Sequence, residues 1–329
     1  MNGRVINLAT AAGFVLLSAM HAYAQEAGAD AARNFPTKPL RVIVPFTAGG
    51  GNDIMGRFVS AKLSERLGRQ VVVENRPGAD GIIGADVAAK SPPDGYTLLV
   101  VSISYAMNAA LHDLPFDPVK SFVAISQFGT GPSVLAVTPA LPVSSIRQLI
   151  TLAKAKPGQL HYASAGIGGV NHFSGELFKL ATGTDIVHVP YRGGGPAMTD
   201  VMAGQVEMQF NSLTAALTHI RSGKLKALGV GSLKRVPVLP DVAAIAETVP
   251  GYESVIWWGL LGPAGVPPSI VARLNAEIGA ILREPETVKR LESEAAVAVI
   301  ANPDAFGKLI VDEVAKWTRV GKAAGIKLQ

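Results

Sequence analysis

The chain has 329 residues, a formal net charge of +5 at pH 7, 48% hydrophobic residues and no cysteine. The lack of cysteine excludes thiolate catalysis and cysteine metal sites. The lysines and arginines are scattered, with no basic run and no interleaved aromatic residues, which argues against a nucleic-acid partner.

The N-terminal segment has the pattern of a secretory signal peptide. Arg4 provides a positive start, residues 11–20 are apolar, and Ala22-Tyr23-Ala24 forms an A-x-A cleavage site. The apolar part is shorter than the ~20 residues that a membrane span needs. We therefore expect residues 1–24 to be removed after Ala24 on export to the periplasm, and residues 25–35 to form a disordered leader.

A glycine loop between a strand and a helix is the first functional signal. An apolar β-branched run at 42–44 precedes Gly49, Gly50 and Gly51, and apolar residues then recur every four positions up to Gly68. Such a helix N-terminus directs free backbone N–H groups and a positive dipole end toward an anion. The dinucleotide fingerprint is excluded because Ile54 stands where it needs a glycine. The alternative is that the glycines only form a flexible turn.

The rest of the chain alternates between strand and helix patterns. Strands are predicted at 70–75, 96–102, 122–128, 134–137, 160–164, 186–189, 206–210, 225–230 and 256–261. Helices are predicted at 82–90, 145–155 and 213–220, from residue 169 to Gly183, from Pro196 onward, and as a C-terminal pair at 269–283 and 304–324. This order predicts an α/β fold with parallel, doubly wound sheets.

A second glycine loop, at residues 165–169, repeats the strand–loop–helix design of the first. Ligands of open α/β sheets lie beyond the carboxyl ends of the strands. If two lobes face each other, both helix N-termini converge on one cleft. Two positive dipole ends there suit a ligand with two or more carboxylates.

Seven motifs in series carry a family resemblance. They are KPLRVIVPFTAGGGNDIMGR, VVVENRPGADGIIGA, SPPDGYTLL, LPFDPVKSF, HYASAGIGGVNHFSGELF, HVPYRGGGPAMTDVMAGQVEMQF and WWGLLGPAGVP. The chain resembles the Bug-type extracytoplasmic solute receptors of tripartite tricarboxylate transporters. The resemblance covers nearly the whole sequence after residue 35.

The resemblance implies a periplasmic binding protein of type II, the Venus flytrap, with two α/β lobes around a central cleft. It places lobe 1 at 36–130 plus 257–329 and lobe 2 at 131–256, with crossings near 129–133 and 254–258. It implies a receptor that binds a di- or tricarboxylate or an aromatic carboxylate. The expected partners are the membrane subunits of a transporter. We expect a monomer that needs no metal and no cofactor and does not insert into a membrane.

The resemblance also implies ligand contacts in both loops. In lobe 1 they are Phe46, Thr47, Ala48, Gly50, Gly51 and Asp53, and in lobe 2 they are Ser164, Ala165, Gly166 and Gly168. Relatives usually have serine or threonine where this chain has Gly169. One hydroxyl donor is therefore missing, and backbone N–H groups or Asn171 would replace it. A hydroxyl-to-carboxylate bond contributes roughly 1.5–3 kcal/mol, enough to change which acid is preferred.

Further polar residues have two interpretations each. Asp53 either contacts the ligand or is an ordinary dipole partner, and His172 either pairs with an acid or packs. Arg192 either binds a carboxylate with its guanidinium fork or forms a salt bridge. Ser102, Ser104 and Asn211 end strands and are candidates for lining the cleft, whereas Trp257 and Trp258 are expected to pack at the hinge.

Two other functions remain as alternatives. A periplasmic hydrolase finds little support, because the sequence has no G-x-S-x-G, H-E-x-x-H or P-loop motif. A receptor that presents its closed form to a signalling membrane protein would use the same closed state as a transport receptor.

Overall fold

The computed structural model describes residues 34–324 and shows an α/β protein built on one curled, mixed sheet. The predicted signal peptide and most of the predicted leader lie outside the described residues. The strands are β1 (Leu40–Val44), β2 (Val71–Asn75), β3 (Thr97–Ser102), β4 (Phe122–Val137), β5 (Leu160–Ser164), β6 (Ile186–Pro190), β7 (Met208–Ser212), β8 (Lys226–Val230) and β9 (Val255–Pro263). The helices are α2 (Gly51–Leu67), α3 (Ile82–Ala89), α4 (Ile103–Leu111), α5 (Ile146–Ala155), α6 (Val170–Thr182), α7 (Gly194–Met202), α8 (Leu213–Arg221), α9 (Pro268–Arg283), α10 (Pro285–Ser293) and α11 (Pro303–Ala324).

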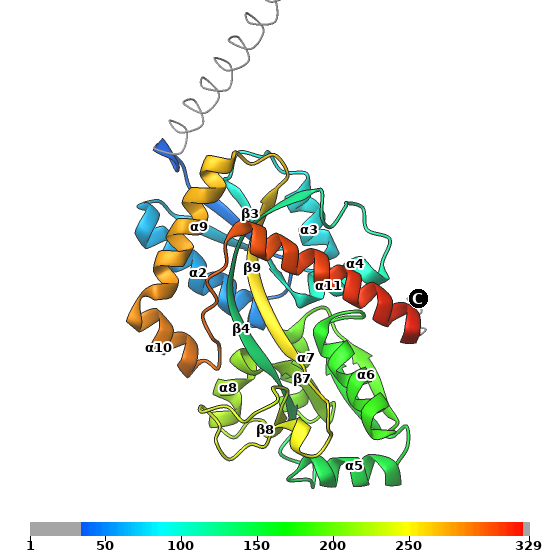
Figure 1. Cartoon of the computed structure of the whole chain (residues 1–329). Helices are drawn as coiled ribbons and strands as arrows, with labels where there is room; N and C mark the ends of the chain where they lie inside the picture. Colours follow the sequence, from blue (N-terminus) through cyan, green and yellow to red (C-terminus); the bar gives the residue numbers. More distant parts are fainter. Residues whose placement is uncertain (1–33, 325–329) are drawn as a thin grey trace, which may run out of the picture.

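The two halves of the sheet form two lobes, as the type II binding-protein fold predicts. In lobe 1, β1 pairs in parallel with β2 and β3, and in lobe 2, β5 pairs in parallel with β6 and β7. The long strands β4 and β9 run side by side through the middle of the molecule (Figure 1). The expectation of purely parallel sheets was wrong, because β9 is antiparallel to β3 and β4, and β4 is antiparallel to β7 and β8. The chain leaves lobe 1 along β4 and returns along β9, so these two strands must run in opposite directions.

Strand β4 is continuous where the sequence predicts two strands separated by a crossing. Its residues up to Pro132 pair with β9, and those from Ser133 onward pair with β7. Gly131 keeps the strand extended at a crowded point, since a Cβ there would lie 2.8 Å from the backbone oxygen of Ala295. The glycines and the proline of this segment therefore accommodate close packing and do not end the strand.

Three helical predictions need correction. The sequence analysis missed α4, whose residues are apolar almost throughout and show no clear helical period, and α10, so three helices follow β9 and not two. Pro196 is the third residue of α7 and not the first, because the helix begins at Gly194.

The lobes touch each other across the cleft. Val170 and Phe173, on α6 of lobe 2, are buried in the hydrophobic core of lobe 1. The Phe173 ring also lies 5.3 Å from the ring of Trp317 on α11, the helix that crosses lobe 1 in Figure 1. The two lobes are therefore in direct contact, and the structure is a closed form of this two-lobed fold.

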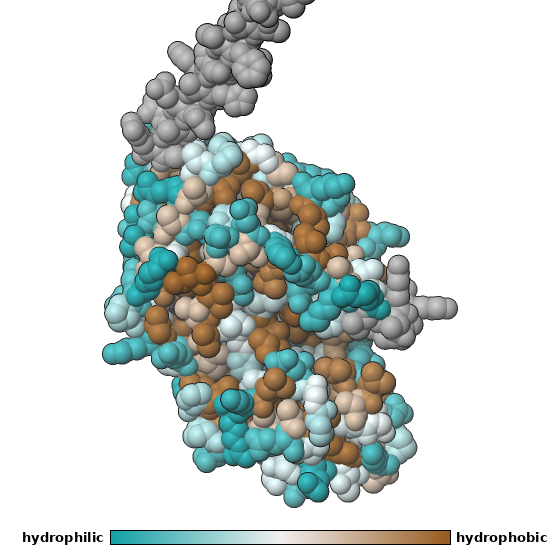
Figure 2. Space-filling model, viewed as in Figure 1, coloured by the Kyte–Doolittle hydropathy of each residue, from teal (hydrophilic) through white to brown (hydrophobic). Residues whose placement is uncertain are grey.

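The visible face in Figure 2 mixes hydrophilic and hydrophobic residues over both lobes. Exposed large apolar side chains such as Leu180, Leu233 and Val297 belong to different parts of the chain. Among the helices that the structure describes, none combines the length and the apolar character needed to cross a membrane.

Candidate functional site

A small cavity lies between the lobes, and its volume is about 40 Å³. We call it the helix-terminus cavity. It is lined by Phe46, Gly50, Gly51, Asn52, Ser102, Ser104, Ala165, Val170, Asn171, Gly194, Asn211, Ser212, Ile256 and Trp258. No charged side chain is in this set.

Five helices begin at the helix-terminus cavity. Gly51, Val170 and Gly194 are the first residues of α2, α6 and α7, and Ser102 and Ser212 are the residues immediately before α4 and α8. Each of the five belongs to a βα connection: α4 and α8 follow directly on β3 and β7, whereas short loops join β1 to α2, β5 to α6 and β6 to α7. None of the five N-cap residues caps its own helix with a side-chain hydrogen bond, and at α6 the Val170 N–H donates to Ser104 Oγ at 3.2 Å. Their positive dipole ends thus converge on one space, which favours an anion there.

Side-chain donors complete this environment. Ser212 Oγ and Trp258 Nε1 are buried and have no hydrogen-bond partner among the described residues. Both residues line the cavity, so both groups are available to the oxygens of a ligand. The sequence analysis missed Ser212 and assigned Trp258 to packing; the position of Ser212 directly after Asn211 at a strand end was the available signal.

The two asparagines that line the cavity hold its lobe 2 wall in place. Asn171 donates from Nδ2 to the backbone oxygen of Phe210 and, at 3.4 Å, to Oδ1 of Asn211. Oδ1 of Asn211 also accepts from the N–H of Ser212 at 2.8 Å. The amide oxygen of Asn211 is therefore fully engaged in fixing the start of α8.

Close packing across the cleft uses glycines on both sides. A Cβ on Gly51 would lie 2.9 Å from the side chain of Ser212, and a Cβ on Gly195 would lie 2.6 Å from the backbone oxygen of Ala48. A Cβ on Gly193 would clash with Thr47. Thr47 and Ala48, both predicted ligand contacts, are therefore placed against the opposite lobe and do not line the helix-terminus cavity.

Asp53 supports the first glycine loop from behind. It is 4% exposed, and its carboxylate accepts from the Gly49 N–H, from Arg57 Nε and from Asn75 Nδ2 at 2.8–3.0 Å. Burial raises the pKa of this carboxyl, but the three hydrogen bonds together hold it below its ordinary value. Asp53 is thus ionised, and its carboxylate oxygens accept hydrogen bonds that hold the first glycine loop in place.

Ser164 and His172 support the second glycine loop in the same way. Ser164 Oγ donates to the backbone oxygen of Gly166 at 2.7 Å and lies 2.6 Å from Nε2 of His188. His172 Nδ1 accepts from the Gly168 N–H at 3.2 Å, and its ring stacks on His188 with 4.0 Å between centroids. Burial, with a smaller contribution from His172, lowers the pKa of His188 to about 4, so the His188 ring is uncharged at pH 7.

A second, larger cavity of about 340 Å³ adjoins the first, and we call it the charged cavity. It is lined by Phe46, Gly78, Ala79, Asp80, Gly81, His112, Ala165, Gly166, Ile167, Pro190, Tyr191 and Arg192. Phe46 and Ala165 line both cavities. Arg192 is exposed, and it lines the charged cavity but not the helix-terminus cavity.

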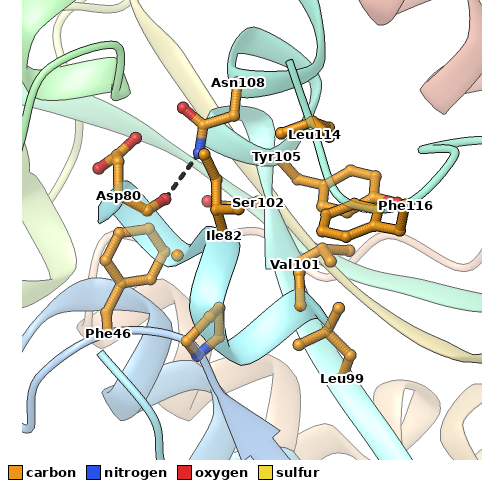
Figure 3. Close-up of a pocket in the computed structure, with 13 residues that line it drawn as sticks. Phe46, Asp80, Ile82, Leu99, Val101, Ser102, Tyr105, Asn108, Leu114 and Phe116 are labelled. Atoms are coloured by element: carbon orange, nitrogen blue, oxygen red, sulfur yellow. Dashed lines mark hydrogen bonds between the residues drawn. The ribbon is translucent and has the colours of Figure 1, made fainter. Parts of the chain in front are cut away.

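A third, tight cavity of about 20 Å³ lies behind the site in lobe 1, lined mainly by apolar side chains such as Leu99, Val101 and Phe116 (Figure 3). Asp80 stands at its edge. Asn108 Nδ2 donates to the backbone oxygen of Asp80 at 2.7 Å, while the carboxyl group of Asp80 points away from the apolar side chains. The sequence analysis missed Asp80, which lies in a loop it treated as a connection.

The predicted site residues thus fall into three groups. Those lining the helix-terminus cavity are Phe46, Gly50, Gly51, Ser102, Ala165, Asn171 and Asn211. Gly166 and Arg192, with Phe46 and Ala165 again, line the charged cavity. The others, Thr47, Ala48, Asp53, Ser164, Gly168, Gly169 and His172, form or support the loops. Within residues 34–324, no group of three or more acidic or histidine side chains is arranged to hold a metal ion.

Comparisons with known proteins identify the family of this chain. The sequence model described as "Tripartite tricarboxylate transporter family receptor" matches residues 55–326. Protein BugT of Bordetella pertussis is 38% identical over 302 residues, covering 91% of this chain and 93% of BugT.

Two solved structures of similar proteins contain ligands. Rpa4515 of R. palustris with adipate is 35% identical, with a TM-score of 0.86, and the match covers 89% of this chain and 99% of that one. MatC (Rpa3494) of Rhodopseudomonas palustris with bound malate is 31% identical, with a TM-score of 0.82, covering 87% and 99%.

Proposed function

The chain belongs to the tripartite tricarboxylate transporter receptor family, and from this premise we propose that it binds a small organic acid between its two lobes. The observation that carries the proposal is the convergence of five helix N-termini, none capped by the side chain of its own N-cap residue, on a cavity whose lining has no charged side chain. Free N–H groups and positive dipole ends stabilise a carboxylate there. Ser212 and Trp258 add two unpartnered donors.

The ligand extends from the helix-terminus cavity into the charged cavity. The first has room for little more than one carboxylate in this closed form, whereas the second is several times larger. Phe46 and Ala165 belong to both walls, so one elongated molecule contacts both. Adipate and malate, present in the two similar structures, each carry carboxylates at two ends.

Ligand binding shifts the hinge equilibrium toward closure, because the closed form places both lobes against the ligand. We place the lobe boundaries at residues 130/131 and 256/257, on the long strands β4 and β9. The closed surface is then recognised by the membrane subunits of the transporter, which take the ligand from the receptor in the periplasm. No chemical change of the ligand is part of this function.

A thermal-shift screen of the mature chain against organic acids tests the proposal. The protein is first unfolded and refolded to remove any carried-over ligand. Binding to the native state alone stabilises it by about 2.7 kcal/mol at a hundredfold excess over Kd, so the melting temperature rises with ligand concentration. A concentration-dependent shift with one class of acid is expected. The proposal would be overturned if none of the acids raised the melting temperature, or if the purified protein converted any of them chemically.

A further inference from the structure

Asp80 carries a buried carboxyl group that nothing else in the described chain binds. The residue is 8% exposed, and both carboxyl oxygens lack a hydrogen-bond partner among the described residues. Its backbone has a φ of 49°, in the left-handed region, which fixes the direction of the side chain. Figure 3 shows the carboxyl group directed toward the lobe 2 ribbon and away from the apolar side chains of lobe 1.

The carboxyl group occupies space at the start of α6, across the cleft from its own lobe. A Cβ on Gly169 would lie 2.8 Å from each oxygen of Asp80, and a Cβ on Gly166 would lie 3.1 Å from Oδ1. The glycine at position 169 is therefore explained by the aspartate at position 80. The carboxyl group of this side chain enters the cleft where a hydroxyl side chain has no room.

The neighbouring side chains do not neutralise Asp80. The amide of Asn108 donates to the Asp80 backbone oxygen at 2.7 Å, and its lowering effect on the carboxyl pKa is smaller than the raising effect of burial. His112 lines the same cavity, but burial lowers its pKa, so the ring is uncharged at pH 7. Arg192 is exposed and makes no salt bridge with Asp80. Burial raises the pKa of the Asp80 carboxyl well above its ordinary value, which reflects this lack of a partner.

We propose that Asp80 determines ligand specificity by pairing with a cationic nitrogen of the ligand, so that the bound acid is an amino acid or another amine-bearing acid. The inference rests on the proposed function, since it concerns the end of the ligand that reaches the charged cavity. A buried carboxylate is stable when a charged, hydrogen-bonded partner meets it, and an ammonium group supplies both. The carboxylate of the same ligand end is then placed near Arg192. A second carboxylate without an adjacent amine leaves the Asp80 carboxyl group without a charged partner.

Isothermal titration with matched ligands tests the pairing. Each pair differs by one amino group: succinate with aspartate, and adipate with 2-aminoadipate. The wild-type chain is expected to bind the amine-bearing member of at least one pair ten times more tightly than the plain acid. Asp80→Asn removes the charge and keeps the shape of the side chain. In this variant the ratio of the two affinities is expected to shift by at least tenfold toward the plain acid.

Two further variants control for folding and for net charge. Asp80→Gly tolerates the positive φ and also removes the carboxyl group, so it is expected to lose the preference as Asp80→Asn does. Glu65→Gln makes the same charge change on the outside of α2, where the side chain is 67% exposed, and is expected to keep the wild-type preference.

The outcomes separate the inference from the proposed function. If the wild-type chain binds an acid but neither Asp80 variant changes the ratio of the two affinities, Asp80 does not set specificity and the inference is wrong, while the receptor function stands. If neither the wild-type chain nor any variant binds an acid in the titrations or in the thermal-shift screen, the proposed function fails and the inference fails with it.

Discussion

The helix-terminus cavity and the charged cavity bind by different means, although they share Phe46 and Ala165. The first offers helix ends and neutral donors, whose positions are fixed by the βα connections of the fold. The second offers Asp80, His112 and Arg192, whose identities depend on single positions in the chain. We therefore propose that affinity for a carboxylate comes from the βα connections of the fold, whereas the choice among acids comes from a few side chains that single substitutions can change.

The variant that tests both cavities together is Gly51→Ala. Its Cβ would lie 2.9 Å from the Ser212 side chain across the cleft, so the lobes cannot close to the observed distance. We expect at least a hundredfold loss of affinity for the cognate acid in isothermal titration, equivalent to about 2.8 kcal/mol. Alanine suits a helix better than glycine, so α2 itself is not weakened.

Gly307→Ala on α11 is the matched control for this variant. Its Cβ would meet the Cβ of Ala124 at 3.7 Å, an ordinary contact, so affinity is expected to stay at the wild-type value. Unchanged affinity in Gly51→Ala would show that the closed form seen here is not the one that holds ligand.

Arg192→Ala tests the charged cavity alone. A charge-assisted hydrogen bond contributes roughly 1.5–3 kcal/mol, so a ten- to hundredfold loss of affinity is expected. Arg147→Ala, at an exposed position on α5 of the same lobe, makes the same change in net charge and should bind normally. Equal affinities of the two variants would exclude Arg192 as a ligand contact.

Trp258→Phe tests the helix-terminus cavity alone and should have the smallest effect. It removes the unpartnered Nε1–H, a neutral donor worth about 0.5–1.5 kcal/mol, so a loss of roughly three- to tenfold is expected by titration. Trp257→Phe is the control, because its Nε1 is also buried without a described partner, yet it lines neither cavity. If both variants lose affinity equally, the loss reflects packing and not a hydrogen bond to the ligand.

Local patterns predicted most elements of this fold but not the length of the strands that join the lobes. Glycines, prolines and capping residues act over a few positions, so helix ends such as Gly68 and Gly183 follow from the sequence. The continuity of β4 through Gly129, Gly131 and Pro132 depends on its partner β9, which lies more than a hundred residues away in the chain. The same holds for α4, whose largely apolar sequence becomes helical in its tertiary setting.

The candidate site divides in the same way. The two glycine loops, with Gly51 and Ala165 in the cavity wall, were predicted because a strand–glycine–helix pattern is local and has a direct physical meaning. The roles of Asp53 and His172 were left open and Ser164 was expected to contact the ligand, since only the hydrogen-bond partners decide whether such a side chain faces the ligand or the loop. Only the tertiary structure brought Asp80 of one lobe against Gly169 of the other. Contact across a cleft depends on how the two lobes close, and it produces no repeating pattern in the sequence from which it could be predicted.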